Sequence, residues 1–287
     1  MMRTLLTTCA ARIALGLGLG LVLCLAHRAN AAGPEAATTA TTPTTSATPM
    51  SAAQIVSRNV AARGGLAAWR NISTLTFSGQ MDAGGKQNVE LPYVMRLKRG
   101  HKSRLEIRFQ EQTAVQVFDG KQGWKLRPFL NRGEVEAFTA DEVRAAAAWD
   151  ELDGPLIDHT AKGIKVDFVG SEAVDGRATY KLRLVSPGGE QRHLWVDAGT
   201  FLEVKIEGPP RRFDGRLRKV VVLYRDFLAE GAVTIPRTFE TVLEGVKPGR
   251  KLQITKVLVN EPMAEHLFAR PELAMVQAPL ALAGGGK

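Results

Sequence analysis

The sequence predicts a mainly β (α+β) protein: one large curved antiparallel sheet, or unclosed β-barrel, of about 11 strands capped by helices. First, many short segments alternate apolar and polar residues, as half-buried strands do. Second, Asp-Gly and Pro-Gly pairs between these segments predict tight reversals. Third, two helical patterns interrupt the strands, but no second composition boundary follows. We therefore expect one folded domain over residues 51–273.

The first folded element is expected to be a helix. Ser51 and Gln54 fit a capping box, in which the Ser side chain and the Gln side chain each satisfy a free backbone N–H. Apolar residues then recur at helical spacing up to Ile72. Because glycine weakens a helix, Gly64-Gly65 predicts a break or bend there.

Strands are expected next, at 75–82, 89–98, 104–110, 113–118 and 123–127. Their apolar rows lie on alternate residues, so each row faces one side of its strand. We expect these rows to build one apolar face together. Its expected members are Tyr93, Met95, Leu97, Leu105, Ile107, Phe109, Val115, Val117 and Trp124. Trp124, beside the Asp119-Gly120 turn, fits an ordinary core position, which is the default for a large aromatic residue, and a cavity mouth is the alternative. Whether the protein's own side chains fill this face or leave room for a guest decides what it can do.

A second helix is expected over about 140–152, because Thr139 and Glu142 form another capping-box pair and Gly154-Pro155 ends the pattern. The strands then resume. Their expected ranges are 165–171, 178–185, 190–196, 202–207, 219–227, 234–242 and 252–258.

The N-terminus indicates export. Residues 1–31 read as a signal peptide, with an apolar stretch too short and glycine-rich to span a bilayer and a small-residue site at Ala29-Asn30-Ala31. Both cysteines, Cys9 and Cys24, lie in this leader, so we expect no disulfide in the exported chain. The alternatives are an uncleaved anchor and a lipid-modified Cys24, which the bulky Leu23 disfavours. Residues 32–50 read as a flexible Ala/Thr/Pro linker and 274–287 as a disordered tail.

The charge balance is basic. The chain has 38 Lys and Arg against 29 Asp and Glu, and without the leader the balance is 35 against 29, or +6. The excess lies on two groups of strand residues: Arg96, Lys98, Arg99, Lys102, Arg104 and Arg108, then Arg211, Arg212, Arg216, Arg218 and Lys219. We interpret each group as a solvated strand face; the alternative is attraction to anionic lipid headgroups or an acidic partner. Aromatic residues do not alternate with these charges, so we expect no nucleic-acid partner.

The sequence predicts no catalytic residues, metal or cofactor. It contains no H-E-x-x-H, G-x-S-x-G, P-loop or C-x-x-C motif. Asp158-His159 is the best candidate for acid-base work, but an acidic loop after a helix explains it more simply. We therefore expect a protein that is not an enzyme.

Several short motifs resemble one family. The run Val94-Met95-Arg96-Leu97-Lys98-Arg99, then Leu105-Glu106-Ile107, Asp119-Gly120-Lys121, Trp124 and Pro128-Phe129, resembles the periplasmic lipoprotein carrier LolA and its outer-membrane relative LolB. Trp195-Val196-Asp197 with Leu202-Glu203-Val204, and Tyr224-Arg225-Asp226-Phe227 with Gly231 and Ile235-Pro236, look like later strands of the same lipoprotein-sorting family.

The resemblance implies an unclosed barrel whose helices form a lid over an apolar interior that accepts acyl chains. It implies a periplasmic carrier or chaperone in outer-membrane biogenesis, with lipoprotein acyl chains or another lipid as cargo and inner-membrane donor and outer-membrane acceptor proteins as partners. Arg99 matches the family's basic residue that governs lid closure and transfer, although Gly100 stands where the family has proline. An envelope-stress sensor with the same fold, or a periplasmic hydrolase at Asp158 and His159, are the alternatives.

Overall fold

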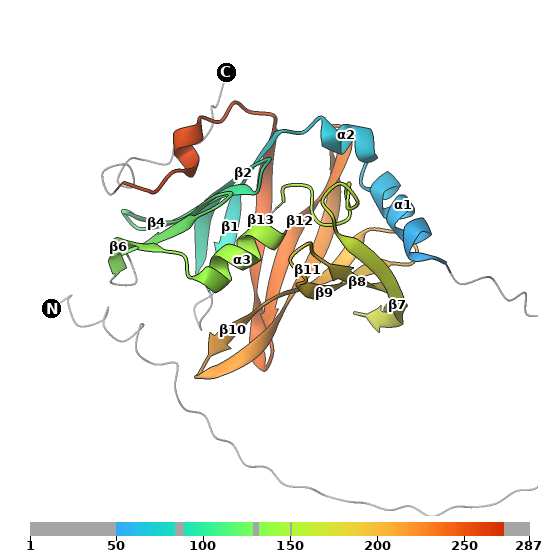
Figure 1. Cartoon of the computed structure of the whole chain (residues 1–287). Helices are drawn as coiled ribbons and strands as arrows, with labels where there is room; N and C mark the ends of the chain where they lie inside the picture. Colours follow the sequence, from blue (N-terminus) through green and yellow to red (C-terminus); the bar gives the residue numbers. More distant parts are fainter. Residues whose placement is uncertain (1–49, 84–88, 129–131, 150, 273–287) are drawn as a thin grey trace, which may run out of the picture. The chain divides into compact units, whose positions relative to one another are not determined.

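One antiparallel sheet of 13 strands organises the part of the chain that the computed structural model describes, which is residues 50–83, 89–128, 132–149 and 151–272 (Figure 1). The expected signal peptide, linker up to residue 49 and tail lie outside these residues. All described elements belong to one compact unit that begins at Met50. The expected fold class is confirmed, with 13 strands where about 11 were expected.

The sheet consists of two meanders. The first contains β1 (Thr74–Asp82), β2 (Glu90–Lys98), β3 (Lys102–Phe109), β4 (Gln112–Asp119), β5 (Gly123–Arg127) and β6 (Arg132–Ala137). The second contains β7 (Lys165–Val174), β8 (Arg177–Val185), β9 (Gln191–Asp197), β10 (Glu203–Phe213), β11 (Arg216–Glu230), β12 (Val233–Leu243) and β13 (Val246–Val259). The strand order is β6-β5-β4-β3-β2-β1-β13-β12-β11-β10-β9-β8-β7, so β1 and β13 join the meanders and the sheet stays unclosed between β6 and β7.

The helices are α1 (Ala52–Ala62), α2 (Leu66–Arg70) and α3 (Ala140–Trp149). Both expected capping boxes are present: Ser51 N–H donates to Gln54 Oε1 at 2.9 Å, and Thr139 N–H donates to Glu142 Oε2 at 2.8 Å. Gly64 and Gly65, with φ of +106° and +90°, separate α1 from α2. At Gly64 a Cβ would lie 2.1 Å from the Ala232 carbonyl oxygen, so a larger residue would collide with the sheet.

The face of the sheet that packs against α1 and α2 is called the inner face here. Ile55 and Val56 of α1 pack on the second meander, among Leu182, Leu194 and Ile206. Trp69 of α2 packs on the other half, with Leu75 and Phe77 of β1. The helices therefore cover the inner face near both meanders, as amphipathic helices on a sheet do.

The register corrects one sequence expectation. Tyr93 lies opposite Ile107 and Met95 opposite Leu105, which confirms that β2 and β3 share an apolar row on the inner face. Val115, however, lies opposite Glu106 and Val117 opposite Arg104, so both point to the outer face. Trp124 lies opposite Val117 and shares that outer face. The expectation that all these rows form one face is wrong for β4 and β5, because the β3–β4 turn sets their register one residue off the assumed one.

The outer face of β4 and β5 has its own cover. The 3₁₀ helix η2 (Glu265–Phe268) and the segment before it place Met263 and Phe268 against Val117 and Trp124. Phe268 is 1% exposed. Trp124 is thus partly buried and packs beneath the C-terminal part of the described chain.

Candidate functional site

The inner face carries an apolar row that crosses five neighbouring strands. Cross-strand partners lie side by side on one face of a sheet. The strand register links these partners in order from β11 to β2: Tyr224, Phe239, Leu252, Met81 and Leu91. On the same face, Gly79, Tyr93 and Ile107 form the next row, and Phe77, Met95 and Leu105 form the row after it. Most of these side chains are only partly buried, so the middle of the inner face presents apolar surface that the chain does not fully cover.

Two tyrosines shape this surface. The Tyr93 hydroxyl donates to the Gln253 carbonyl at 3.3 Å. Gly79 of β1, which lies opposite Tyr93, has no side chain, so the backbone of β13 comes close to the backbone of β1 here. The Tyr224 ring meets the Phe239 ring edge to face, with centroids 5.4 Å apart. Burial raises the pKa of Tyr224 to about 12 and also raises the pKa of Tyr93. Both phenols therefore stay neutral at physiological pH, as an apolar lining requires.

Part of the inner face is already filled. The segment between α3 and β7, residues 151–164, is called the covering segment here. It inserts Leu152 and Ile157 into the cluster around Trp69, and Leu156 into the cluster around Ile55. Leu156 and Ile157 are both 0% exposed. The covering segment thus occupies apolar surface next to the half-buried rows.

The α1–α2 corner is fixed to the sheet by a buried ion pair. Arg63 Nη1 lies 2.7 Å from Glu203 Oε1, with side chains 8% and 5% exposed. Arg63 Nε also donates to the Thr234 carbonyl, and its guanidinium lies over the Trp69 ring at 4.5 Å. Loss of either partner would leave the other charge buried without compensation, so this pair ties the corner to the sheet.

Arg99, which directly follows β2, fixes the covering segment. Its guanidinium donates to the carbonyls of Trp69 and Ile72, at 2.5 and 2.7 Å, and so satisfies acceptors at the end of α2. It also contacts Asp153 Oδ2 at 3.0 Å. Asp153 is 1% exposed and receives a second cation, Lys162. Arg99 therefore joins a strand end, a helix end and the covering segment through one side chain.

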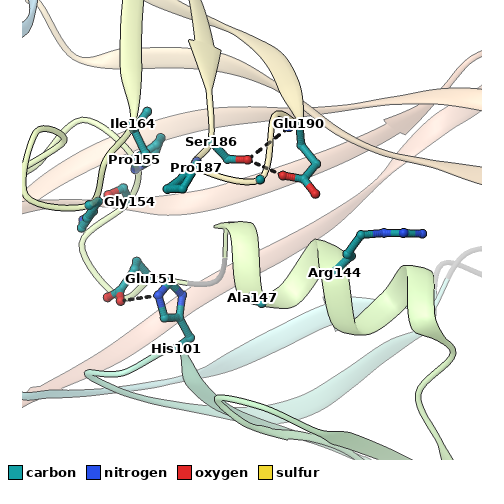
Figure 2. A pocket seen from close by; sticks show the side chains of 12 residues that line it. His101, Arg144, Ala147, Glu151, Gly154, Pro155, Ile164, Ser186, Pro187 and Glu190 are labelled. Atoms are coloured by element: carbon teal, nitrogen blue, oxygen red, sulfur yellow. Dashed lines mark hydrogen bonds and ion pairs between the residues drawn. The ribbon is translucent and has the colours of Figure 1, made fainter.

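A pocket of about 320 Å³ lies on the other side of the covering segment, between α3 and the β8–β9 turn (Figure 2). Ala147 and Arg144 line it from α3, and Ser186 and Pro187 line it from the turn. His101 Nε2 contacts Glu151 Oε1 at 3.2 Å, as Figure 2 shows. This space leaves the covering segment without dense packing on that side.

Asp158 and His159, the sequence candidates for acid-base chemistry, have structural partners. Asp158 accepts two hydrogen bonds from Arg70, at 2.8 and 2.9 Å, and this guanidinium holds the pKa of the carboxyl below its usual value. His159 Nδ1 lies 3.1 Å from the Ile164 carbonyl oxygen of its own loop. Over the described ranges, no group of three His, Cys, Asp or Glu residues could hold a metal ion.

The structure brings together five of the residues expected on the apolar face. These are Tyr93, Met95, Leu97, Leu105 and Ile107, which belong to or pack against one cluster. Phe109 continues the same alternation at the end of β3, whereas Val115, Val117 and Trp124 lie on the outer face. The sequence analysis missed Tyr224, Phe239 and Leu252, which arrive from the distant strands β11, β12 and β13. Their alternation with polar residues was visible, but not their position beside β1.

Among the described helices, none is long and apolar enough to cross a membrane.

The fold is shared with solved structures. No family model and no curated protein sequence matches the chain. An outer membrane lipoprotein-sorting protein domain from Vibrio parahaemolyticus is similar over 78% of this chain and 97% of its own, at 11% identity and a TM-score of 0.50. A DUF1329 family protein from Desulfovibrio piger is similar over 78% and 98%, at 12% identity and a TM-score of 0.51. A LolA superfamily protein from Nitrosomonas europaea covers 77% and 98%, at 15% identity and a TM-score of 0.49. The chain shares its fold with the Vibrio parahaemolyticus and Desulfovibrio piger proteins.

Proposed function

We propose that this protein is a non-enzymatic carrier in the bacterial periplasm that shelters the acyl chains of a lipoprotein, or another lipid, against the inner face of its sheet. The observation that carries the proposal is the half-buried apolar row from Tyr224 to Leu91, which crosses five strands next to the covering segment. A row of this kind can cover hydrocarbon that would otherwise face water.

The size of the effect supports this role. A buried methylene contributes about 0.8 kcal/mol, so eight of them on this face would contribute about 6 kcal/mol before the cost of association. Hydrophobic burial is not directional, so such a face accepts chains of different length. The cargo could then pass to an acceptor that binds it more tightly, without covalent chemistry. An inner-membrane donor and an outer-membrane acceptor are the partners that this role requires.

The covering segment is the element that must move. Leu152, Leu156 and Ile157 occupy apolar surface that acyl chains would use, so cargo and covering segment compete for it. The pocket beside Glu151 gives the segment space on its other side (Figure 2). Arg99 would set the balance, because it ties Asp153 to the sheet and to α2. In this role Arg99 controls the cover and does not contact the cargo.

Uptake of a pyrene-labelled fatty acid by the purified chain tests the proposal. We expect binding with micromolar or tighter affinity, and at least a tenfold loss in the variants Ile107→Asp and Phe239→Asp, because each puts a charge on the apolar inner face. Val169→Asp is the matched control: it makes the same change at an exposed residue of edge strand β7 and should leave uptake unchanged.

Circular dichroism and thermal unfolding of each variant separate loss of uptake from loss of fold. Folded variants at positions 107 and 239 that bind the probe as the parent does would overturn the proposal. Absence of lipid in the gently purified protein, determined by native mass spectrometry, together with no uptake by the parent chain, would overturn it as well.

A further inference from the structure

The hairpin between β10 and β11 extends past its neighbours. β12 ends at Leu243, opposite Val220, while β10 and β11 continue to pair with each other through Arg211 with Arg218 and Phe213 with Arg216. On its other side, the pairing of β10 with β9 stops at Ile206. Residues 211–218, called the basic hairpin here, therefore form strand pairs only with one another, and Figure 1 shows this turn at the bottom of the view.

The basic hairpin and the adjacent β12–β13 turn hold the charge excess of the chain. Residues 208–219 and 244–251 contain eight basic and two acidic residues, a net charge of +6. Residues 32–287 as a whole also carry +6, so the rest of that stretch is balanced. The positive charge is concentrated at one end of the sheet, which is the arrangement that attracts an anionic surface.

The two basic groups of the sequence differ in their partners. On β2 and β3, Arg96 and Arg104 each contact Glu106, at 2.8 and 2.7 Å, and Lys98 contacts Glu265 at 2.6 Å. In the basic hairpin, the side chains of Arg211, Arg212 and Arg216 have no hydrogen bond or ion pair with any residue that the structure describes. These cations of β2 and β3 therefore have acidic partners within the protein, whereas the three arginines of the basic hairpin have none among the described residues.

The charges surround the hairpin on both faces. Arg212 and Leu217 lie opposite each other and share one face, while Arg211 and Arg218 share the other. Partial burial of its guanidinium and the like charge of Arg250 on β13 lower the pKa of Arg211, so positive charges crowd this end. Leu217 is 63% exposed, the largest value among the exposed large hydrophobic residues.

We propose that the basic hairpin docks the protein on an anionic phospholipid membrane. One guanidinium group can donate two hydrogen bonds to the oxygens of one phosphate. An exposed leucine between such arginines can enter the headgroup region. A site for one small anion would need side chains that converge on it. The arginines of the basic hairpin instead lie on both of its faces, and this arrangement suits a broad anionic surface that the tip of the hairpin meets. Membrane docking goes beyond cargo shelter, since it does not use the inner face.

Binding of the full exported chain to vesicles tests the proposal. We expect co-sedimentation with vesicles of 70% phosphatidylcholine and 30% phosphatidylglycerol, little binding to pure phosphatidylcholine, and release at 0.5 M salt. Each basic residue near an anionic surface contributes about fivefold in affinity, so Arg211→Gln, Arg212→Gln and Arg216→Gln combined should weaken binding about a hundredfold.

A second triple variant provides the matched control. Lys121→Gln, Lys165→Gln and Arg177→Gln remove the same charge from exposed positions elsewhere and should change binding less than threefold. Fluorescence of a Leu217→Trp variant should shift to the blue with anionic vesicles, which reports entry of that side chain into the headgroup region.

Equal losses in the two triple variants would overturn the proposal, because binding would then follow net charge alone. Absence of vesicle binding by the parent chain at low salt would also overturn it and would favour an acidic protein partner for the hairpin. Uptake of the pyrene-labelled fatty acid should be unchanged in the hairpin variant, so failure of membrane docking and failure of the carrier role can be told apart.

Discussion

The α1–α2 corner and the covering segment both lie on the inner face, but they are held in different ways. The corner depends on Arg63 and Glu203, a pair more than nine-tenths buried. The covering segment is tied by Arg99 and Arg70, which are 35% and 59% exposed, and by Lys162, which shares the buried carboxylate of Asp153 with Arg99. Both regions also bury apolar side chains completely. We infer that the exposure of the cations, more than the apolar packing, distinguishes how firmly the two covers are held.

The corner is the place where a single change should cost most. In Arg63→Ala, Glu203 keeps its charge in a buried site without its partner, and Trp69 loses the cation above its ring. We expect the free energy of unfolding to fall by about 3–5 kcal/mol, measured by urea denaturation.

Arg70→Ala is the matched control for the corner, because Arg70 forms an exposed pair with Asp158. Its cost should be much smaller than that of Arg63→Ala, because an exposed ion pair contributes little to stability. Equal losses in the two variants would remove the distinction between a deep tie and a rim tie.

Arg99 tests the covering segment. In Arg99→Ala the carbonyls of Trp69 and Ile72 lose their donor and Asp153 keeps only Lys162. We expect the free energy of unfolding to fall by about 1.5–3 kcal/mol, less than at Arg63. Hydrogen exchange should show faster opening of residues 151–164 at unchanged protection of α1.

The variant Arg99→Lys sharpens this test. Lysine keeps the charge near Asp153 but lacks the planar fork that reaches two carbonyls and a carboxylate together. An intermediate exchange rate is expected. Uniform loss of protection across α1 and the covering segment would show that they open as one unit.

Low pH should have a smaller effect on the covering segment than the Arg99 variants have. Arg70 lowers the pKa of Asp158, so this contact stabilises the fold fully above the ordinary Asp pKa of 3.8 and is lost as the pH falls through the lower folded value. Exchange of residues 151–164 between pH 5 and pH 2.5 should therefore quicken more in the parent than in Asp158→Asn, after correction for the intrinsic exchange rate. The same pH dependence in both proteins would assign the effect to other carboxyls.

Much of the fold could be predicted because strand alternation and turn residues are local signals. The first seven residues of β7 and all of β5 lie where the alternation placed them. Strand β6 was missed, since its sequence Arg132-Gly133-Glu134-Val135-Glu136-Ala137 has one large apolar residue and only its pairing with β5 makes it a strand. Strands β10 and β11 are longer than expected, because Pro209-Pro210 and the charged residues that follow look like a loop in isolation.

The candidate site was only partly predictable. The alternation of apolar and polar residues shows which residues of one strand share a face. The register between two strands depends on the turn that joins them, and this is why Val117 and Trp124 were assigned to the wrong face. The contribution of Phe239 and Leu252 depends on the pairing of β13 with β1, which no local pattern specifies. The pairing of Arg99 with Asp153 likewise joins residues 54 positions apart.

The junction of the two meanders has a consequence for how the chain acquires its structure. Every other strand pairing joins neighbours in sequence, whereas Leu75 meets Val259 across nearly the whole described chain. Closing so large a loop costs conformational entropy before the contacts between β1 and β13 can offset that cost. Each meander can therefore form early and locally, and the β1–β13 pairing should be the late, slow step that commits the polypeptide to its final architecture.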